Sequence, residues 1–167
     1  MSEASARGIF IRPARAEDRD GLLAILASDE TFKEDERAVA TELIDGALSG
    51  SVDYHVLLAD AEAAAEGPLV AGYLCYGPTP MTAATYDLYW IVVHAEARGK
   101  GVAASLIRAM EDELRRRGGK AVRVETSETE GYGAARKLYA RLEYPLAAVL
   151  TDFYREGDAL LTYYKRL

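Results

Sequence analysis

The stretch from Tyr86 to Arg117 constrains the fold most, because it joins an apolar run to an amphipathic helix through a turn with two glycines. Tyr86 to Val93 has the composition of a strand, and the turn that follows carries Arg98-Gly99-Lys100-Gly101. Beyond the turn, apolar residues recur with the spacing of one helical face, at Val102, Leu106, Met110 and Leu114. A strand, a glycine turn and a helix in this order predict an α/β or α+β fold with a mixed sheet.

The turn itself has the features of a phosphate-binding loop. The first N–H groups of a helix have no partner within the helix, and the helix dipole adds partial positive charge at that end. Arg98 and Lys100 add full charges, although basic residues in a turn are often simply solvated. We therefore predict a site for a phosphate or pyrophosphate group. The turn matches neither a Walker A loop nor the glycine pattern of a Rossmann turn.

The same turn carries a family resemblance. Arg98-Gly99-Lys100-Gly101-Val102-Ala103 resembles the (Gln/Arg)-x-x-Gly-x-(Gly/Ala) signature of the GCN5-related N-acetyltransferases, the GNAT family. The resemblance implies that the loop holds the pyrophosphate of acetyl-CoA through Arg98, Gly99, Lys100, Gly101, Val102, Ala103 and Ala104. It also implies that the backbone at the end of the preceding strand pairs with the pantetheine arm of CoA, at Ile91, Val92 and Val93.

A second segment, residues 132–144, resembles the pattern Asn-x-x-Ala-x-x-(Phe/Leu)-Tyr-x-x-x-Gly-Phe of the same family, with matches at Ala135, Leu138, Tyr139 and Tyr144. Tyr132 stands where the family has asparagine, so a CoA contact at Tyr132 would lack the amide hydrogen bond. Glu143 stands where the family has glycine. We expect a different turn into the next strand, assisted by Pro145.

The resemblance implies two catalytic residues. Tyr139 would protonate the departing CoA thiolate, for which a phenol with a pKa of about 10 is suited; the alternative is a tyrosine packed in the core. Asp87 lies six residues before Val93, where several family members place a general base, because an ammonium with a pKa of about 10.4 must lose a proton before it can attack. The alternatives are a solvent-facing Asp87 and a water positioned by Tyr89.

Which face of the strand each side chain occupies affects these roles. In a regular strand Asp87, Tyr89, Ile91 and Val93 would share one face, and a bulge would break that pattern.

The rest of the chain follows the element order of the resembled family. We expect strands over residues 9–12, 54–59, 69–76, 86–93, 121–125, 146–154 and 160–165, and helices over 36–48, 102–117 and 133–142. A first helix, capped near Asp18 or Asp20, is expected to carry Leu22, Leu23, Ile25 and Leu26. Residues 60–67 read as a hairpin loop, and Gly77-Pro78-Thr79-Pro80 as the end of the third strand. The resemblance implies a mixed, mostly antiparallel sheet of about seven strands flanked by about four helices, in one domain over residues 1–167 with its core from residue 9.

Composition excludes several function classes. A formal net charge of −7 over 167 residues disfavours a nucleic-acid partner, and no segment has the length and apolarity of a membrane span or a signal peptide. The single cysteine cannot form an internal disulfide, so a cytoplasmic location is the default. Two histidines and one cysteine at unrelated spacings predict no metal site.

We therefore expect direct transfer of an acetyl group from acetyl-CoA to a primary amine of a small molecule or peptide. In the resembled family the segment between the first two helices lines the acceptor pocket, which makes Thr31, Phe32 and Glu34 candidate contacts, unless they are ordinary loop residues. The aromatic residues near the C-terminus shape the acceptor site or a homodimer contact, if they do not simply pack. The alternatives are a CoA-binding module without catalysis and an acyltransferase for a larger acyl group.

Overall fold

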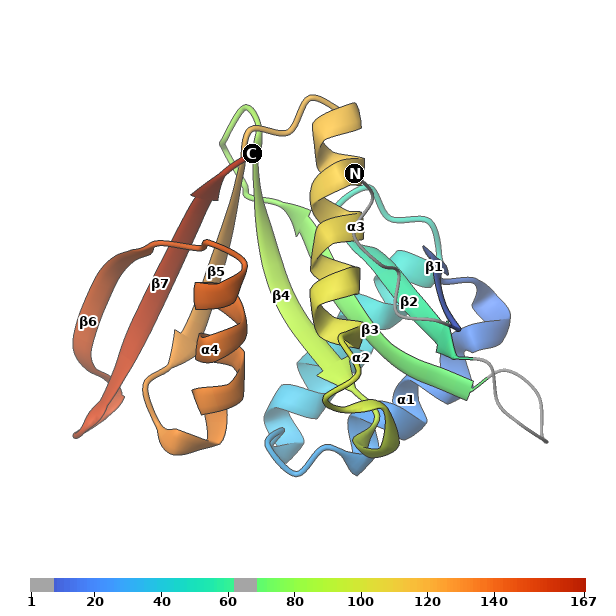
Figure 1. Cartoon of the computed structure of the whole chain (residues 1–167), viewed down its shortest axis with the longest axis horizontal. Helices are drawn as coiled ribbons and strands as arrows, with labels where there is room; N and C mark the ends of the chain where they lie inside the picture. The colour runs from blue at the N-terminus through green and yellow to red at the C-terminus, as the bar shows by residue number, and fades with distance from the viewer. Residues whose placement is uncertain (1–7, 62–68) are drawn as a thin grey trace.

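The computed structural model describes residues 8–61 and 69–167, which form one seven-stranded sheet covered by helices on both faces. The strand order is β1-β2-β3-β4-β5-β7-β6. Helices α1 and α2 cover one face, and α3 and α4 lie on the other (Figure 1). The strands are β1 (Ile9–Pro13), β2 (His55–Ala61), β3 (Leu69–Pro78), β4 (Thr85–Val93), β5 (Ala121–Ser127), β6 (Leu146–Arg155) and β7 (Asp158–Arg166). The helices are α1 (Arg19–Ser28), α2 (Glu34–Leu48), α3 (Val102–Arg116) and α4 (Gly133–Arg141), with short 3-10 turns η1 (Ala16–Asp18), η2 (Ala95–Ala97) and η3 (Glu130–Tyr132).

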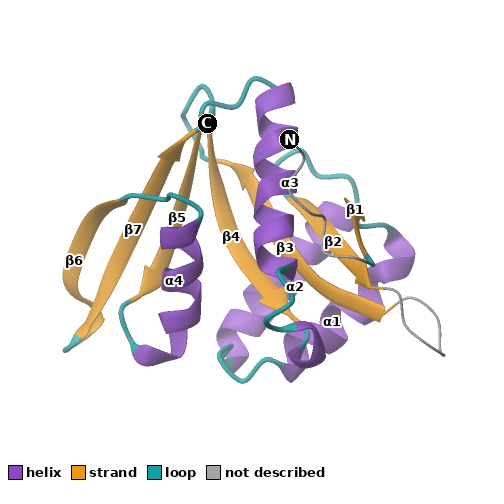
Figure 2. Ribbon diagram, viewed as in Figure 1, coloured by secondary structure: helices purple, strands orange, loops and turns teal. Residues whose placement is uncertain are grey.

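The sheet is mixed, as the sequence predicts. β4 and β5 run parallel, and every other neighbouring pair is antiparallel. Parallel neighbours need a long crossover, and α3 provides it between β4 and β5 (Figure 2). The predicted apolar face of this helix is confirmed, since Val102, Leu106, Met110 and Leu114 are at most 2% exposed.

Two hydrophobic cores lie on opposite faces of the sheet. One joins α3 and α4 to side chains such as Leu88, Val124 and Tyr163. The other joins α1 and α2 to side chains of β2, β3 and β4, among them Tyr73 and Val92. Helices α1 and α2 therefore cover only the half of the sheet that contains β2 to β4, and no helix is drawn behind β5, β7 and β6 (Figure 1).

Several boundaries differ from the sequence predictions. β3 continues through Gly77 and Pro78, which pair with Asp87 and Tyr86, so the predicted break at these residues is wrong. Pairing between β2 and β3 ends at Tyr76, so the missing N–H of Pro78 costs no bond to β2. Helix α2 begins at Glu34, two residues earlier than predicted. Of the predicted hairpin loop, residues 60 and 61 belong to β2, and the rest lies outside the described residues.

β6 forms the edge of the sheet, and all ten of its residues are exposed. Its pairing with β7 shifts between Leu150 and Arg155, where Asp152 has a φ of +55°. Within residues 8–61 and 69–167, no helix combines the length and apolarity needed to cross a membrane.

Candidate active site

The sheet forks between β4 and β5. These strands pair over only four residues, from Thr85–Ala121 to Leu88–Val124, and then separate (Figure 1). The separation begins at a bulge in β4, because Leu88 pairs with Tyr76 and Trp90 pairs with Cys75, which leaves Tyr89 without a partner on β3. A bulge bends its strand and increases its twist, so it accounts for the divergence of β4 from β5.

The bulge also decides which side chains face which core. Tyr89 and Trp90 both pack on the side of α1 and α2, whereas Ile91 and Val93 pack on the side of α3. Asp87 follows Tyr86 and precedes Leu88, both of which face α3, so it points to the α1 side. The single face expected for a regular strand is therefore divided at the bulge.

The end of β4 presents backbone groups to the fork. The His94 N–H donates to the Ala71 carbonyl at 2.9 Å, so the backbone N–H of His94 points toward β3. Because backbone N–H and C=O groups alternate in direction along a strand, those of Ile91 and Val93 point away from β3 and into the fork. The Val93 carbonyl there accepts a hydrogen bond from Arg98 Nε at 3.3 Å.

The loop before α3 gathers free backbone donors. Gly99 and Gly101 have φ values of +75° and +81°, a region that disfavours side chains. The first bond of the helix runs from the Ser105 N–H to the Gly101 carbonyl at 3.0 Å, and no side chain caps the helix. Within the described chain, the N–H groups of residues 99–104 donate to no protein group. Consecutive free amides at a helix start form an anion-binding site.

The two basic residues of this loop behave differently. Lys100 is exposed. Arg98 turns back, donating to Val93 and lying 3.5 Å from Asp29 Oδ2 through Nη2. Asp29 follows the last residue of α1, and its other oxygen accepts from the Thr31 N–H at 2.9 Å. Arg98 thus links the end of β4 to the α1–α2 segment, a contact between residues 69 positions apart that local sequence does not indicate.

Tyr139 lies on α4, on the α3 side of the fork. Its side chain is buried among Tyr144 and Tyr163, with ring centroids 6.0 and 5.4 Å away. Tyr144 donates to Glu111 at 2.8 Å, whereas the Tyr139 hydroxyl makes no hydrogen bond to another residue in the described parts of the chain. Burial raises the pKa of Tyr139 well above that of a free phenol, so it carries its proton at neutral pH.

The turn after α4 departs from its sequence prediction. The sequence predicts a different turn at Glu143, but Glu143 adopts the left-handed φ of +59° that a glycine would take. The Tyr144 N–H donates to the Tyr139 carbonyl at 2.9 Å, so the turn closes without the glycine. Lys165 fixes the same region by donating to both oxygens of Glu111 at 2.9 and 3.1 Å. Tyr132, at the start of α4, is half-buried, and burial raises its pKa.

Asp87 is engaged by a residue that the sequence reasoning missed. Arg123 of β5 donates to Asp87 through Nε at 2.7 Å and Nη2 at 3.1 Å. Asp87 is only 7% exposed, and its hydrogen bond raises the pKa of Arg123. The role of Asp87 as a base stays a prediction, and this pair counts against it because both carboxylate oxygens already accept hydrogen bonds. In Ala121–Ser127 polar and apolar residues alternate, so Arg123 and Glu125 lie on one face of the sheet and Val122 and Val124 on the other. This alternation is the sequence signal that could have identified Arg123.

The predicted acceptor segment lies beside the fork. Phe32 packs on Trp90 of β4 with centroids 6.1 Å apart, and Tyr89 packs on Tyr54 at 5.9 Å. Thr31 reaches η3, where a Cβ on Gly131 would lie 3.9 Å from its methyl group. Glu34 begins α2 and is exposed. The segment therefore bridges the two arms of the fork on the α1 side.

Cys75 and the possible metal ligands are further candidates for a role in the site. Cys75 is buried, and burial raises the pKa of its thiol to about 12, so it stays protonated and a poor nucleophile. In the part of the chain that the structure describes, no group of three His, Cys, Asp or Glu residues is arranged to hold a metal ion.

Comparison with known proteins gives a consistent result. A family model described as the acetyltransferase (GNAT) family matches residues 20–144. A candidate GNAT-family acetyltransferase from Desulfovibrio desulfuricans is 34% identical, over 95% of this chain and 98% of that one, with a TM-score of 0.86. No curated protein matches the sequence.

More distant structures share the fold. An aminoglycoside 6'-N-acetyltransferase complexed with coenzyme A has a TM-score of 0.70 at 16% identity, over 94% of this chain and 96% of that one. The ribosomal-protein-S18-alanine N-acetyltransferase from Escherichia coli has a TM-score of 0.73 at 16% identity, over 95% and 93%.

Proposed function

Since this chain belongs to the acetyltransferase (GNAT) family, we propose that it transfers the acetyl group of acetyl-CoA directly to a primary amine of a small molecule or peptide. The observation that carries the proposal is the run of free N–H groups over residues 99–104, at the start of α3 and beside the fork. These donors and the helix dipole fit a diphosphate. The small side chains of Ala103 and Ala104 let it approach the backbone closely.

In this proposal the end of β4 holds the arm that carries the acetyl group. The backbone groups of Ile91 and Val93 point into the fork, where no strand of the described chain lies beside them. An amide-containing chain can pair with such an edge as another strand would. Arg98 would then release the Val93 carbonyl or stay beside the arm; its 3.3 Å contact is among the weaker hydrogen bonds of the site.

Tyr139 is the proposed proton donor to sulfur. It carries its proton at neutral pH, it lies on the α4 side of the fork, and its hydroxyl makes no hydrogen bond to the described residues that would have to break first. A protonated group near the leaving sulfur lowers the cost of expelling it.

The acceptor is the least defined part of the proposal. The two distant relatives act on an aminoglycoside and on the alanine of a ribosomal protein by their names, and both acceptors present primary amines. The aromatic residues Phe32, Trp90 and Tyr89 on the α1 side give this chain an apolar surface beside the fork. Such a surface suits the body of an amine rather than its charge.

Two measurements test the function. Calorimetric titration with CoA should give 1:1 binding, and acetyl-CoA with a panel of amines should release free thiol with at least one acceptor. Binding without transfer to any amine would favour the alternative of a catalytically lapsed CoA module. A higher kcat/KM with a longer acyl-CoA would favour the alternative of a larger acyl group.

The proposal extends to a homodimer through β6. The segment from Leu146 to Thr151 has no charged residue, and Leu146, Val149 and Leu150 are about half exposed. An uncharged, exposed edge strand tends to pair with another strand. Antiparallel pairing of β6 with its own copy would use the free backbone groups of both edges about a two-fold axis.

A cytoplasmic location also stays a prediction.

A further inference from the structure

We infer that Glu125 of β5 is the carboxylate that takes the proton from the attacking amine. The inference rests on the proposed function and deepens it by assigning the base. It starts from the two carboxylates that flank Arg123, namely Asp87 across the ladder and Glu125 on the same strand.

The first argument is position along β5. Leu88–Val124 is the last pair of the β4–β5 ladder, so Glu125 is the first residue of β5 inside the fork. It pairs with Thr162 of β7 on one side only, and its other side faces the space that β4 has left. The proposed acetyl group lies in this space, beside the bulge at Tyr89.

The second argument is the face of the sheet. Val122 and Val124 pack into the core beneath α3 and α4, so Glu125 points to the opposite face, where no helix of the described chain covers β5 (Figure 2). Tyr139 approaches from the α4 side. A base and an acid on opposite faces suit acyl transfer, because the amine enters on one side of the carbonyl carbon and the thiol leaves on the other.

The third argument is availability. Asp87 is nearly buried and accepts two hydrogen bonds from Arg123. Glu125 is exposed, and its one ionic contact in the described chain is a longer one, 3.6 Å from Arg123 Nη1. Its carboxylate can therefore turn to an amine without breaking a short hydrogen bond. Asp87 holds the guanidinium in place, which makes it a positioning residue for Glu125.

The groups that face Glu125 come from three strands. Arg123 lies beside it on β5 and Asp87 lies beyond Arg123 on β4. Tyr154 of β6 is 51% exposed; partial desolvation and then the negative charge of Glu125 raise its pKa, so it lies within electrostatic range of the same carboxylate. The aromatic ring and two acidic groups around one arginine favour a cationic acceptor.

The proton and electron balance is simple. The ammonium gives one proton to Glu125, and the nitrogen lone pair then forms the bond to the acetyl carbonyl carbon. The carbon–sulfur bond breaks with its electron pair on sulfur, which takes a proton from Tyr139. The second nitrogen proton restores Tyr139 through water, and Glu125 releases its proton to solvent, so each turnover yields one amide, one thiol and one proton.

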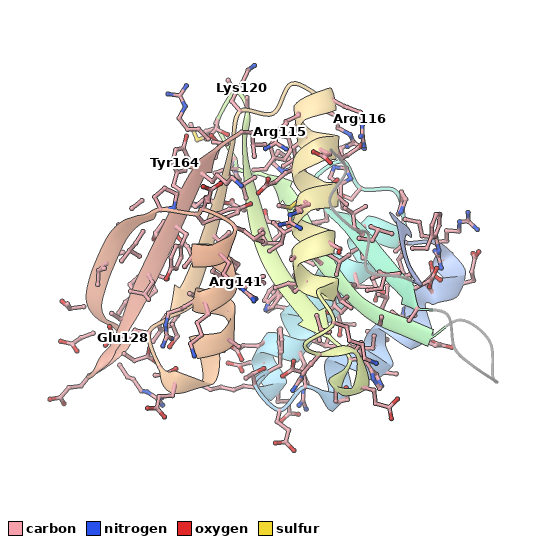
Figure 3. The ribbon with its side chains drawn as sticks, in the orientation of Figure 1. Arg115, Arg116, Lys120, Glu128, Arg141 and Tyr164 are labelled. Atoms are coloured by element: carbon pink, nitrogen blue, oxygen red, sulfur yellow. The ribbon has the colours of Figure 1, made fainter. Side chains whose placement is uncertain are left out.

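The test compares three single variants of the full chain with an acceptor found in the amine panel. Glu125→Gln should lower kcat/KM for the amine by about 10²-fold or more, the usual contribution of a general base. Its kcat/KM should then rise steadily with pH, because the variant can use only the fraction of the amine that is already neutral. Its acetyl-CoA dissociation constant should stay that of the wild type. Glu128→Gln is the matched control, an exposed glutamate just beyond β5 (Figure 3), and should behave as the wild type. Asp87→Asn should lower activity but keep the pH profile of the wild type.

Two further readouts separate chemistry from structure. Thermal unfolding of each variant checks the fold, and added formate should partly restore the rate of Glu125→Ala but not of Asp87→Ala. A Glu125→Gln enzyme that keeps both its rate and its pH profile would overturn the assignment, as would a steady rise of kcat/KM with pH in Asp87→Asn alone. If the wild type binds no CoA at all, the proposed function itself fails, and that outcome is distinct from a failure of Glu125.

Discussion

The rings of Tyr139 on α4 and Tyr163 on β7 pack against each other, with centroids 5.4 Å apart and planes inclined by 50°. Both side chains are buried, at 5% and 8% exposure. They share the same hydrophobic core, but only Tyr139 falls at the tyrosine of the family pattern. The two tyrosines are therefore similarly buried, but only Tyr139 has a proposed catalytic role, so Tyr163 can serve as its control.

Tyr139→Phe should reduce kcat by about 10²-fold, because the leaving thiolate would lose its proton donor. The dissociation constant of acetyl-CoA should stay within about twofold, since no binding group is removed. Tyr163→Phe, the control, should keep nearly full turnover. Steady-state kinetics and calorimetry check both, and equal losses in the two variants would reduce Tyr139 to a packing residue.

Gly101→Glu should abolish CoA binding. The substitution places a side chain at φ +81° and puts a negative charge beside the free amides of α3. Gly118→Glu is its matched control, because Gly118 lies just past the other end of α3 with φ +84° and, like Gly101, has nothing within 4 Å of an added Cβ. Calorimetric titration should detect CoA binding in Gly118→Glu only. Binding by both proteins would mean that the phosphate-binding loop is not the one before α3.

Glu143→Gly should stabilise the protein by roughly 0.5–1 kcal/mol. Glu143 has a φ of +59°, which costs a non-glycine residue about 1–2 kcal/mol, while glycine loses part of that gain through its more flexible unfolded chain. The side chain is exposed and makes no hydrogen bond to the described residues, so little else changes. Urea unfolding measures the difference, and a less stable variant would mean that Glu143 contributes a contact worth more than its strain.

Stability should fall as the pH drops from 7 to 5, and His55 should account for part of the fall. Burial lowers the pKa of His55 below its ordinary value of 6.5, beside the ring of Tyr76 at 5.2 Å. Below pH 6.5 the unfolded chain binds more protons at this residue than the folded chain, so protonation favours unfolding. The free energy of unfolding of His55→Gln should vary less with pH over this window. Parallel curves for the two proteins would remove His55 from the effect.

Leu150→Lys should convert a β6-mediated dimer to a monomer, because a charge on the edge strand opposes pairing. Light scattering after gel filtration measures the mass. Phe10→Lys, on the opposite edge of the sheet and 66% exposed, is the control and should leave the mass unchanged. A monomeric wild type would reject the dimer.

The elements that sequence predicted are those whose signals are local. The face of α3 follows from the spacing of Val102, Leu106, Met110 and Leu114, and the loop before it from two glycines at a helix start. The choice of Tyr139 as a candidate acid followed from the resemblance to the family, and that role stays a prediction.

The rest depends on contacts between distant residues. Nothing in the side chains of Tyr86–Val93 marks Tyr89 as a bulge, because that depends on the register with β3. The pair between Asp87 and Arg123 joins residues 36 positions apart, and it sets which carboxylate is available. Pro78 stayed in its strand because β2 had already ended.

The short ladder between β4 and β5 also has a mechanical consequence. Four residue pairs hold the arm made of β1 to β4 to the arm made of β5 to β7, so this seam is the weakest place in the sheet for the two arms to pivot. A ligand bound in the fork and in contact with both arms would restrict this pivoting. Amide hydrogen exchange along Thr85–Leu88 should then slow markedly when the ligand is bound.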